Sequence, residues 1–393
     1  MKRVYLDYAS TTPIDKEALK EFVRVSKDCF GNPGAIYEEG VVAKNALLNA
    51  RKNVADLIGG HADEIIFTSG GTESNNGAIF GVVNSLVSKG VNYKDIHIIS
   101  SNIEHSSVVE CLNYLISKGV KVDFLKVNSA GLVDGRDLRK LLNKKTVLVS
   151  VMYANNEIGT IQPIKEIAKE IRHFRKLNSS SSFYPYFHVD ASQAFCYEDL
   201  KMESLGVDFL SLDGQKVYGP KGVGALFIKR GLLISPINFG GGQEGGLRSG
   251  TPNVPSICAF AKALSICDKE RTKEVKRILP LRDFLIKEIS KIFDGAILNG
   301  DFNKRLANNI NFSLPNCDTE MLALRLDSKG FSVSTKSACL SSEIGSYVVS
   351  ALEDNKDGWR SKNTLRITLA RYTSKDDCKK FIKALSLLKK KFF

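Results

Sequence analysis

One lysine occupies a position suited to Schiff-base chemistry. The apolar run Val207–Leu212 predicts a buried strand, and the turn Asp213–Gln215 places Lys216 just beyond its end. Glycines at positions 214, 219, 222 and 224 surround this lysine and are expected to leave room for a ligand beside it. Because most lysines that follow a strand are solvated, a functional interpretation of Lys216 needs other residues of matching chemistry.

Other polar residues follow neighbouring predicted strands. In an open α/β sheet, ligands bind beyond the carboxyl ends of the strands, so residues at these ends should lie close together. Singly, each has an ordinary structural explanation, since a histidine after a strand is more often structural and Asp190 could cap the next helix. The residues that follow strands in this way are Gly71 and Thr72, Glu104 and His105, Asn155–Glu157, Asp190 and Gln193, and Lys216.

Together these side chains match what pyridoxal 5'-phosphate requires of a protein. A helix that begins near Gly71 and Thr72 offers backbone amides and a helix dipole to the phosphate group. A carboxylate such as Asp190 keeps the pyridine nitrogen protonated, so the ring can accept electrons, and an amide can donate to the phenolic oxygen. The Lys216 amine can form a Schiff base with the aldehyde. The sequence therefore predicts a pyridoxal phosphate site at one edge of a sheet.

Strand-like and helical segments alternate from about residue 50 to residue 230. The runs DEIIFTSG, DIHIISSN, TVLVSVMYA, YFHVDASQAF, VDFLSLD and VGALFIKR predict strands, and helical periods follow the first three. This order predicts a mostly parallel sheet with helices on both faces. The pattern changes after GGGQEGGLRSGTPNVP, so we expect a large domain at 13–255 and a smaller α+β domain formed by 1–12 and 256–393. A helix over Ala259–Phe293 is expected to kink or break at Pro280.

Composition argues against several functional classes. The 393 residues are 43% hydrophobic and 25% charged, as in ordinary globular proteins, and no run of about eighteen apolar residues predicts a membrane span. The N-terminal MKRVYLDYAS lacks the apolar stretch of a secretory signal. No nucleic-acid-binding motif accompanies the net charge of +13, so we expect a solvated basic surface or an acidic protein partner. The eight cysteines form no CxxC pair and fit neither a zinc site nor a disulfide framework, which indicates free thiols in the cytoplasm.

Short motifs along nearly the whole chain resemble those of the cysteine desulfurases in the class V aminotransferase group. The resemblance implies the fold-type I architecture of pyridoxal phosphate enzymes: a large α/β domain with a mostly parallel seven-stranded sheet, a smaller α+β domain, and a homodimer. The motifs are YLDYASTTP (5–13), GNP (31–33), FTSGGTESNN (67–76), EH (104–105), NNEIG (155–159), HVDASQ (188–193), GQKVYGPKGVGAL (214–226), RSGT (248–251), SAC (337–339) and LRITLA (365–370).

The resemblance also implies roles for individual residues. Lys216 holds the cofactor, Asp190 pairs with its ring nitrogen, and His105 stacks on the ring and relays protons. The other implied contacts are Asn156 and Gln193 near the ring oxygen, Thr72 and Gly71 at the phosphate, Thr251 at a phosphate across the dimer interface, and Arg366, with Asn156, at the substrate carboxylate.

Cys339 differs from the other cysteines in its surroundings. Cysteines 29, 111, 258, 267 and 378 sit in helical patterns, where a thiol usually acts as a small buried hydrophobe. Cys339 stands in SVSTKSACLSSEIGS, a small and polar stretch typical of a mobile loop, and Lys336 nearby favours its thiolate. The resemblance makes Cys339 the nucleophile and places the chain in the subgroup with a long mobile cysteine loop.

The chain departs from its relatives at several positions. They usually carry Ser-x-His before the lysine, where this chain has Asp213 and Gln215, so a carboxylate and an amide stand in place of two phosphate donors. A carboxylate near a phosphate is repulsive unless it turns away or is protonated. Tyr37 replaces a histidine that is common after GNP, and Lys336 replaces a frequent glycine.

The resemblance implies removal of sulfur from L-cysteine, which leaves L-alanine and a persulfide on Cys339. That sulfur would pass to an acceptor protein for iron–sulfur clusters or tRNA thiolation. Two alternatives remain open at this stage. Another pyridoxal phosphate lyase, such as a selenocysteine lyase or a cysteine β-eliminase, would keep Lys216 and Asp190 without needing Cys339. A cofactor-free scaffold for sulfur transfer would account for Asp213 and Gln215.

Overall fold

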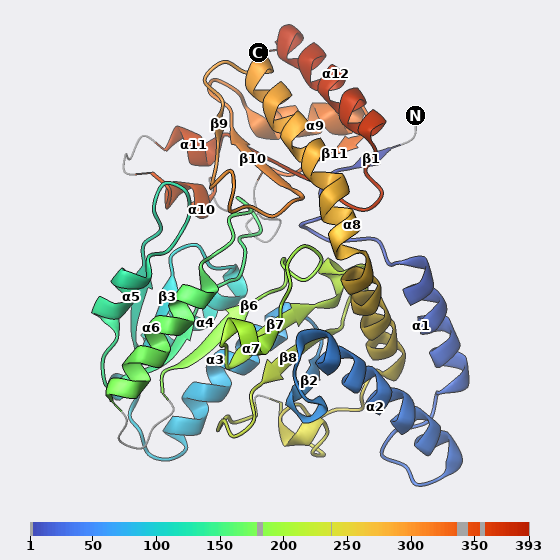
Figure 1. The fold of residues 1–393 in the computed structure, drawn as a ribbon, viewed down its shortest axis with the longest axis vertical. Helices are drawn as coiled ribbons and strands as arrows, with labels where there is room; N and C mark the ends of the chain where they lie inside the picture. The colour runs from blue at the N-terminus through green and yellow to red at the C-terminus, as the bar shows by residue number, and fades with distance from the viewer. Residues whose placement is uncertain (1–2, 179–183, 237, 336–344, 354–357, 393) are drawn as a thin grey trace.

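The computed structural model describes residues 3–178, 184–236, 238–335, 345–353 and 358–392. Its centre is a seven-stranded sheet in the order β2-β8-β7-β6-β5-β3-β4 (Figure 1). Every pairing in this sheet is parallel except those of β8, which runs antiparallel to both β2 and β7, so the predicted mostly parallel sheet is confirmed. Its strands are β2 (Ile65–Thr68), β3 (His97–Ser101), β4 (Lys121–Leu125), β5 (Thr146–Ser150), β6 (Tyr186–Asp190), β7 (Phe209–Asp213) and β8 (Gly224–Ile228).

Helices cover both faces of this sheet because its inner strands are apolar on both sides. Successive side chains of a strand point to opposite faces. In β3, Ile98 packs in one core with α3 and α4, while Ile99 belongs to another with α2, α6 and part of α8. Burial on both faces explains the near-continuous apolar runs of these strands. The helices of this part are α1 (Lys16–Asp28), α2 (Glu38–Ile58), α3 (Gly71–Val87), α4 (Ser106–Ser117), α5 (Gly135–Leu141), α6 (Ile164–Leu177) and α7 (Met202–Leu205).

The edge strand β4 was missed in the sequence. Its residues, KVDFL, mix charged and apolar side chains, and only Leu125 is buried, because β4 has a neighbour on one side only. Charged residues on an edge strand discourage pairing with other chains. A search for apolar runs therefore misses β4, although it finds the apolar and buried strand β2 at the other edge.

A smaller group of elements lies above the main sheet in Figure 1 and has its own core. The long helix α8 (Val254–Ile292) contributes to two cores. Ile257 lies in the core of the main sheet that contains Ile99, and Leu285 lies in the core of the smaller group. Pro280 does not break α8, because Ile278 and Leu281 beside it are buried in the core of the smaller group and offset the lost backbone hydrogen bond. The predicted division near residue 255 stays a prediction.

The smaller group contains two further sheets, a parallel pair β1-β11 and an antiparallel sheet of order β12-β10-β9. In the described part of the chain, no helix is both long and apolar enough to span a bilayer. The remaining elements are β1 (Val4–Tyr5), β9 (Ile297–Leu298), β10 (Asn309–Ser313), α9 (Thr319–Ser328), β11 (Phe331–Ser332), α10 (Tyr347–Ser350), α11 (Trp359–Lys362), β12 (Thr364–Thr368) and α12 (Lys375–Phe392).

The connection from β7 to β8 is packed backbone against backbone. The Gly214 N–H donates to the Val223 carbonyl at 2.9 Å. A Cβ atom on Gly224 would lie 2.6 Å from the Leu212 carbonyl oxygen and 2.7 Å from the Gly70 Cα. The sequence suggested that these glycines leave space for a ligand. At Gly214 and Gly224 the space is instead filled by neighbouring backbone, which holds the connection close to the end of the sheet.

Gly224→Ala should therefore destabilise the fold. The added methyl group must push two backbone segments apart, and overpacking of this kind costs about 1–3 kcal/mol. Gly77→Ala, in the middle of α3, is the matched control, because its Cβ would meet only the flexible end of Leu226 at 3.4 Å and alanine favours a helix. Denaturant unfolding of both variants checks this, and an equal free energy of unfolding for the two would contradict it.

Candidate active site

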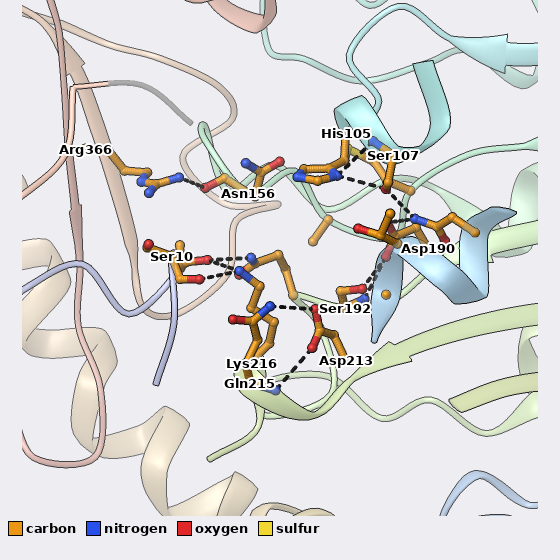
Figure 2. Close-up of a pocket in the computed structure, with 17 residues that line it drawn as sticks. Ser10, His105, Ser107, Asn156, Asp190, Ser192, Asp213, Gln215, Lys216 and Arg366 are labelled. Atoms are coloured by element: carbon orange, nitrogen blue, oxygen red, sulfur yellow. Dashed lines mark hydrogen bonds between the residues drawn. The ribbon is translucent and has the colours of Figure 1, made fainter. Parts of the chain in front are cut away.

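A cavity of about 220 Å³ opens at the carboxyl edge of the main sheet (Figure 2). Thr251 is exposed in the segment before α8 and does not line this cavity, and Cys339 and Lys336 lie outside the described residues. The predicted site residues that line the cavity are Gly71, Thr72, His105, Asn156, Asp190, Gln193, Asp213, Gln215, Lys216 and Arg366. Further lining residues that the sequence did not single out are Ala9, Ser10, Asn75, Ser107, Met152, Ala154 and Ser192.

Lys216 reaches the cavity from the short 3-10 turn η3 (Gly214–Lys216) that follows β7. Its Nζ donates hydrogen bonds to the backbone carbonyls of Ala9 (2.9 Å) and Ser10 (2.5 Å). Gln193 Nε2 donates to the same Ala9 carbonyl at 2.9 Å. The segment after β1 therefore runs across the site and holds both side chains. No residue type in this segment could signal the contact, because the acceptors are backbone atoms.

Asp190, at the end of β6, is held by donors on both of its oxygens. Ser192 donates to Oδ1 from its backbone N–H (2.9 Å) and its hydroxyl (2.7 Å), and Asn75 Nδ2 donates to Oδ2 at 2.7 Å. The same Asn75 amide donates to the Ser107 hydroxyl at 2.8 Å, which lies 2.9 Å from Nδ1 of His105. A continuous hydrogen-bonded network therefore links the carboxylate to the imidazole (Figure 2).

His105 caps the N-terminus of α4. Its Nδ1 accepts the backbone N–H of Ser107 at 3.2 Å, which requires a lone pair on that nitrogen. The neutral ring therefore carries its proton on Nε2. A histidine that caps a helix has a structural role, but here the same residue also lines the cavity.

Glu104, next to His105, is fully buried. Its Oε1 accepts hydrogen bonds from the Ser101 hydroxyl and from the Met152 backbone N–H (3.0 Å), while its Oε2 has no hydrogen-bond partner among the described residues. Burial is the main cause that raises the pKa of Glu104 to about 8, and the charge of Asp190 adds to it. The carboxyl group of Glu104 is therefore neutral near pH 7.

The N-terminus of α3 faces the cavity through glycine. Gly71 begins the helix, and a Cβ at this position would lie 2.8 Å from the Ser192 hydroxyl and 3.3 Å from Oδ2 of Asp213. The exposed amides and dipole of a helix start favour an anion. Here Asp213 already brings a carboxylate close to that position.

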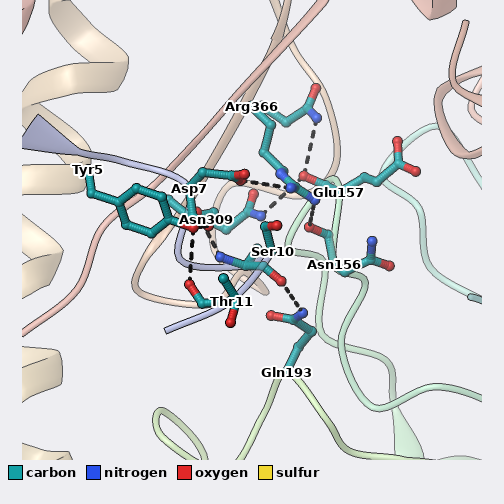
Figure 3. Close-up of polar contacts among 12 residues, drawn as sticks. Tyr5, Asp7, Ser10, Thr11, Asn156, Glu157, Gln193, Asn309 and Arg366 are labelled. Atoms are coloured by element: carbon teal, nitrogen blue, oxygen red, sulfur yellow. Dashed lines mark hydrogen bonds and ion pairs between the residues drawn. The ribbon is translucent and has the colours of Figure 1, made fainter. Parts of the chain in front are cut away.

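Arg366 enters the cavity from β12 of the smaller group and is 1% exposed. Its guanidinium donates to Oδ1 of Asp7 at 2.8 Å and to the Asn156 carbonyl at 3.0 Å (Figure 3). Its Nε is buried and has no hydrogen-bond partner among the described residues. A fixed, partly paired guanidinium of this kind suits the recognition of a carboxylate. The sequence did not identify Asp7 as its partner, because the two residues are 359 positions apart.

The other cysteines offer poor nucleophiles. The seven within the described residues are all free and buried. Burial raises the pKa of Cys111, Cys258 and Cys378 to about 12 and that of Cys317 to about 11. The contact between Cys196 and Cys267, 3.2 Å between sulfurs, together with burial, also raises the pKa of the Cys196 thiol. The thiols with raised pKa values stay protonated at neutral pH, namely those of Cys111, Cys196, Cys258, Cys317 and Cys378.

The fold and the residues that line the cavity agree with one known protein family. The family described as aminotransferase class-V matches residues 4–381, and the chain belongs to that family. The resemblance seen in the motifs is therefore confirmed.

Individual relatives narrow the class further. The chain is 44% identical to the cysteine desulfurase IscS of Dictyoglomus turgidum over 379 residues, which cover 96% of this chain and 92% of the relative. It is 39% identical to the cysteine desulfurase IscS 1 of Archaeoglobus fulgidus over 97% of this chain and 95% of that one. Among solved structures, a NifS-like protein matches with a TM-score of 0.89 and 34% sequence identity, and the match covers 98% of this chain and 99% of that protein. The structure of SspA in complex with cysteine matches with a TM-score of 0.79 and 31% identity, and this match covers 94% of this chain and 99% of SspA.

Glu104→Gln should change how stability depends on pH. The unfolded chain releases the Glu104 proton above a pH of about 4.3, while the folded chain keeps it up to a pH of about 8. The stability that neutral Glu104 contributes is therefore complete below pH ~4 and is lost as the pH rises toward 8. Glutamine cannot ionise, so between pH 5 and 8 the free energy of unfolding should fall less steeply in this variant. Denaturant titrations at several pH values check this, with exposed Glu110→Gln as the control that keeps the wild-type slope. Parallel slopes for all three proteins would contradict a neutral Glu104.

Proposed function

We propose that this chain is a pyridoxal phosphate-dependent cysteine desulfurase, which removes sulfur from L-cysteine and releases L-alanine. The observation that carries the proposal is a single cavity lined by an amine, a carboxylate and an imidazole. The Lys216 amine is held by backbone carbonyls, and the Asp190 carboxylate is joined to His105 through Asn75 and Ser107. The names of the relatives agree with this activity.

The residues of the cavity fit most of the cofactor. Lys216 would hold its aldehyde, Asp190 its ring nitrogen, and the Gly71 helix start its phosphate group. Gln193 and Asn156, which line the same cavity, would supply amide donors to the ring. When bound, pyridoxal phosphate supplies an electron sink for bonds broken at the substrate α-carbon. The donors on both oxygens of Asp190 keep that carboxylate oriented toward the cavity.

Arg366 supplies the recognition of an α-amino acid. Its buried guanidinium, already fixed by Asp7 and by the Asn156 carbonyl, lines the cavity and would pair with a substrate carboxylate. The Lys216 amine would accept the α-proton, and His105, with its proton on Nε2, would donate or return a proton close to the reacting atoms.

Cys339 takes the sulfur in this proposal. Its thiolate forms a new S–S bond to the sulfur of the substrate as the C–S bond breaks, and the carbon skeleton leaves as L-alanine after it gains protons. The support is indirect: among the described cysteines each thiol is buried, and the sequence around Cys339 is small and polar. The persulfide would then pass to an acceptor protein for iron–sulfur clusters or tRNA thiolation.

Two further parts of the proposal concern assembly and location. Thr251 is exposed and lies away from the cavity of its own chain, which supports a homodimer in which it reaches the phosphate site of the partner. The free thiols among the described cysteines fit a reducing compartment, and we propose the cytoplasm.

Lys216→Ala should lower the rate of alanine formation from L-cysteine at least about a thousandfold, because both the covalent attachment of the cofactor and the proton acceptor are lost. Borohydride reduction followed by peptide mass spectrometry should fix pyridoxal phosphate to the Lys216 peptide in the wild type and to no peptide in the variant. Lys221→Ala, a lysine in the same connection that is exposed, serves as the control and should keep both properties. A fixed adduct on a different lysine of the wild type would refute the assignment.

Cys339→Ser separates a desulfurase from a β-eliminase. An eliminase expels sulfide without a protein thiol, whereas a desulfurase needs a thiolate, and a serine hydroxyl is hardly ionised at neutral pH. The variant should bind pyridoxal phosphate and L-cysteine but form no persulfide and almost no alanine. Without reductant, wild-type protein given L-cysteine should gain about 32 Da, the mass of one sulfur atom, on the Cys339 peptide.

Cys29→Ser is the control for this experiment, since Cys29 is buried at the end of α1 and does not line the cavity. It should form persulfide as the wild type does. Sulfide release by Cys339→Ser at the wild-type rate would favour an eliminase. Added sulfur on another cysteine of the wild type would show that Cys339 is not the nucleophile.

A further inference from the structure

Asp213 places a carboxylate where the proposed cofactor would carry its own negative charge. It ends β7, is 8% exposed and lines the cavity. Its Oδ1 accepts the backbone N–H of Gln215 at 3.1 Å, and its Oδ2 accepts the Gln215 side-chain amide at 3.3 Å. These contacts fix the position of the carboxyl group, and no ion pair to Asp213 is found among the described residues.

The carboxylate faces the start of α3. The position of a Cβ on Gly71 lies 3.3 Å from Oδ2, and the corresponding position on Gly70 lies 3.8 Å from Oδ1. Figure 2 shows Asp213 between Ser192 on one side and Gln215 with Lys216 on the other. An anion held by the amides at the start of α3 would therefore be a close neighbour of Asp213.

None of the other charged groups near Asp213 forms an ion pair with it among the described residues. In the cavity, Lys216 donates to the carbonyls of Ala9 and Ser10, Arg366 is paired with Asp7, and Asp190 is a second carboxylate. The elements packed against Asp213 also carry Glu73 of α3, paired with Arg248, and Tyr186 and His188 of β6, of which His188 is kept neutral because burial lowers its pKa to about 4. His105 lines the same cavity. Strand β8, which pairs with β7, contributes only GALFI.

A phosphate monoester is mostly a dianion above its second pKa of about 6. Two anions that share a buried site cannot both stay fully charged, and the usual outcome is that one of them binds a proton. A proton between a phosphate oxygen and a carboxylate oxygen forms a short charge-assisted hydrogen bond, which converts the repulsion into an attraction.

We propose that Asp213 makes cofactor binding in this chain proton-linked: the phosphate group binds at the start of α3 together with one proton from solvent, which it shares with the Asp213 carboxylate. This inference rests on the proposed function, since it takes pyridoxal phosphate as the ligand. It predicts that affinity falls as the pH rises, by about tenfold per pH unit above neutrality for one proton taken up.

Calorimetric titration tests the inference without measuring activity. Apo-protein is titrated with pyridoxal 5'-phosphate at pH 7 and 8, each in two buffers of different ionisation enthalpy and free of inorganic phosphate, which gives the number of protons taken up. Pyridoxal, which lacks the phosphate group, is the matched ligand. Asp213→Asn is the matched variant, because it keeps the size of the side chain and its oxygen toward Gln215 while removing the charge.

The wild type should take up about one more proton with pyridoxal 5'-phosphate than with pyridoxal, and Asp213→Asn should remove that difference. From pH 7 to pH 8 the affinity of the wild type should fall about tenfold more than that of the variant. Equal proton uptake and equal pH dependence in the two proteins would overturn the inference, because Asp213 would then not interact with the phosphate group. The proposed desulfurase function would not be affected by that result. If neither protein binds pyridoxal 5'-phosphate at any pH, this chain does not use that cofactor, and both the proposed function and this inference are refuted.

Discussion

The reversed direction of β8 is the constraint on which the site depends. In a sheet whose other strands all run the same way, the chain usually leaves the carboxyl edge through a helix. Here it returns at once along β8, so the connection after β7 must stay at that edge. The close packing of Gly214 and Gly224 against neighbouring backbone makes this connection stiff. Lys216 is consequently held at a defined place, opposite the start of α3 and beside the end of β6.

Much of this arrangement could be predicted because it follows from strand order and residue type. The inner strands are recognisable as apolar runs, and the rule that ligands bind beyond parallel strand ends brings Gly71, His105, Asp190 and Lys216 together without any coordinates. Arg366 could not be found in this way. It belongs to a different sheet, far along the chain, and only the resemblance to known sequences pointed to it.

What sequence reasoning missed has physical causes. The Ala9 and Ser10 carbonyls hold Lys216, but every residue has a carbonyl, so no residue type marks the contact. Asn75 and Ser107 connect Asp190 with His105, yet in the sequence they are ordinary polar residues of helix starts. Such buried polar networks depend on which helices pack together, and this information appears only in the folded chain.

If Arg366 binds the substrate carboxylate as proposed, its pairing with Asp7 has a consequence for selectivity. Asp7 is tethered beside the guanidinium, so it competes with any incoming carboxylate as an internal ligand whose effective concentration is on the order of millimolar or above. Dilute carboxylic acids that offer nothing else to the cavity lose this competition. An amino acid that also engages groups near Lys216 can displace or share the contact, because its two ends bind together. In the proposed function, the contact with Asp7 compensates the buried guanidinium before a substrate binds and discriminates against ligands that have a carboxylate alone.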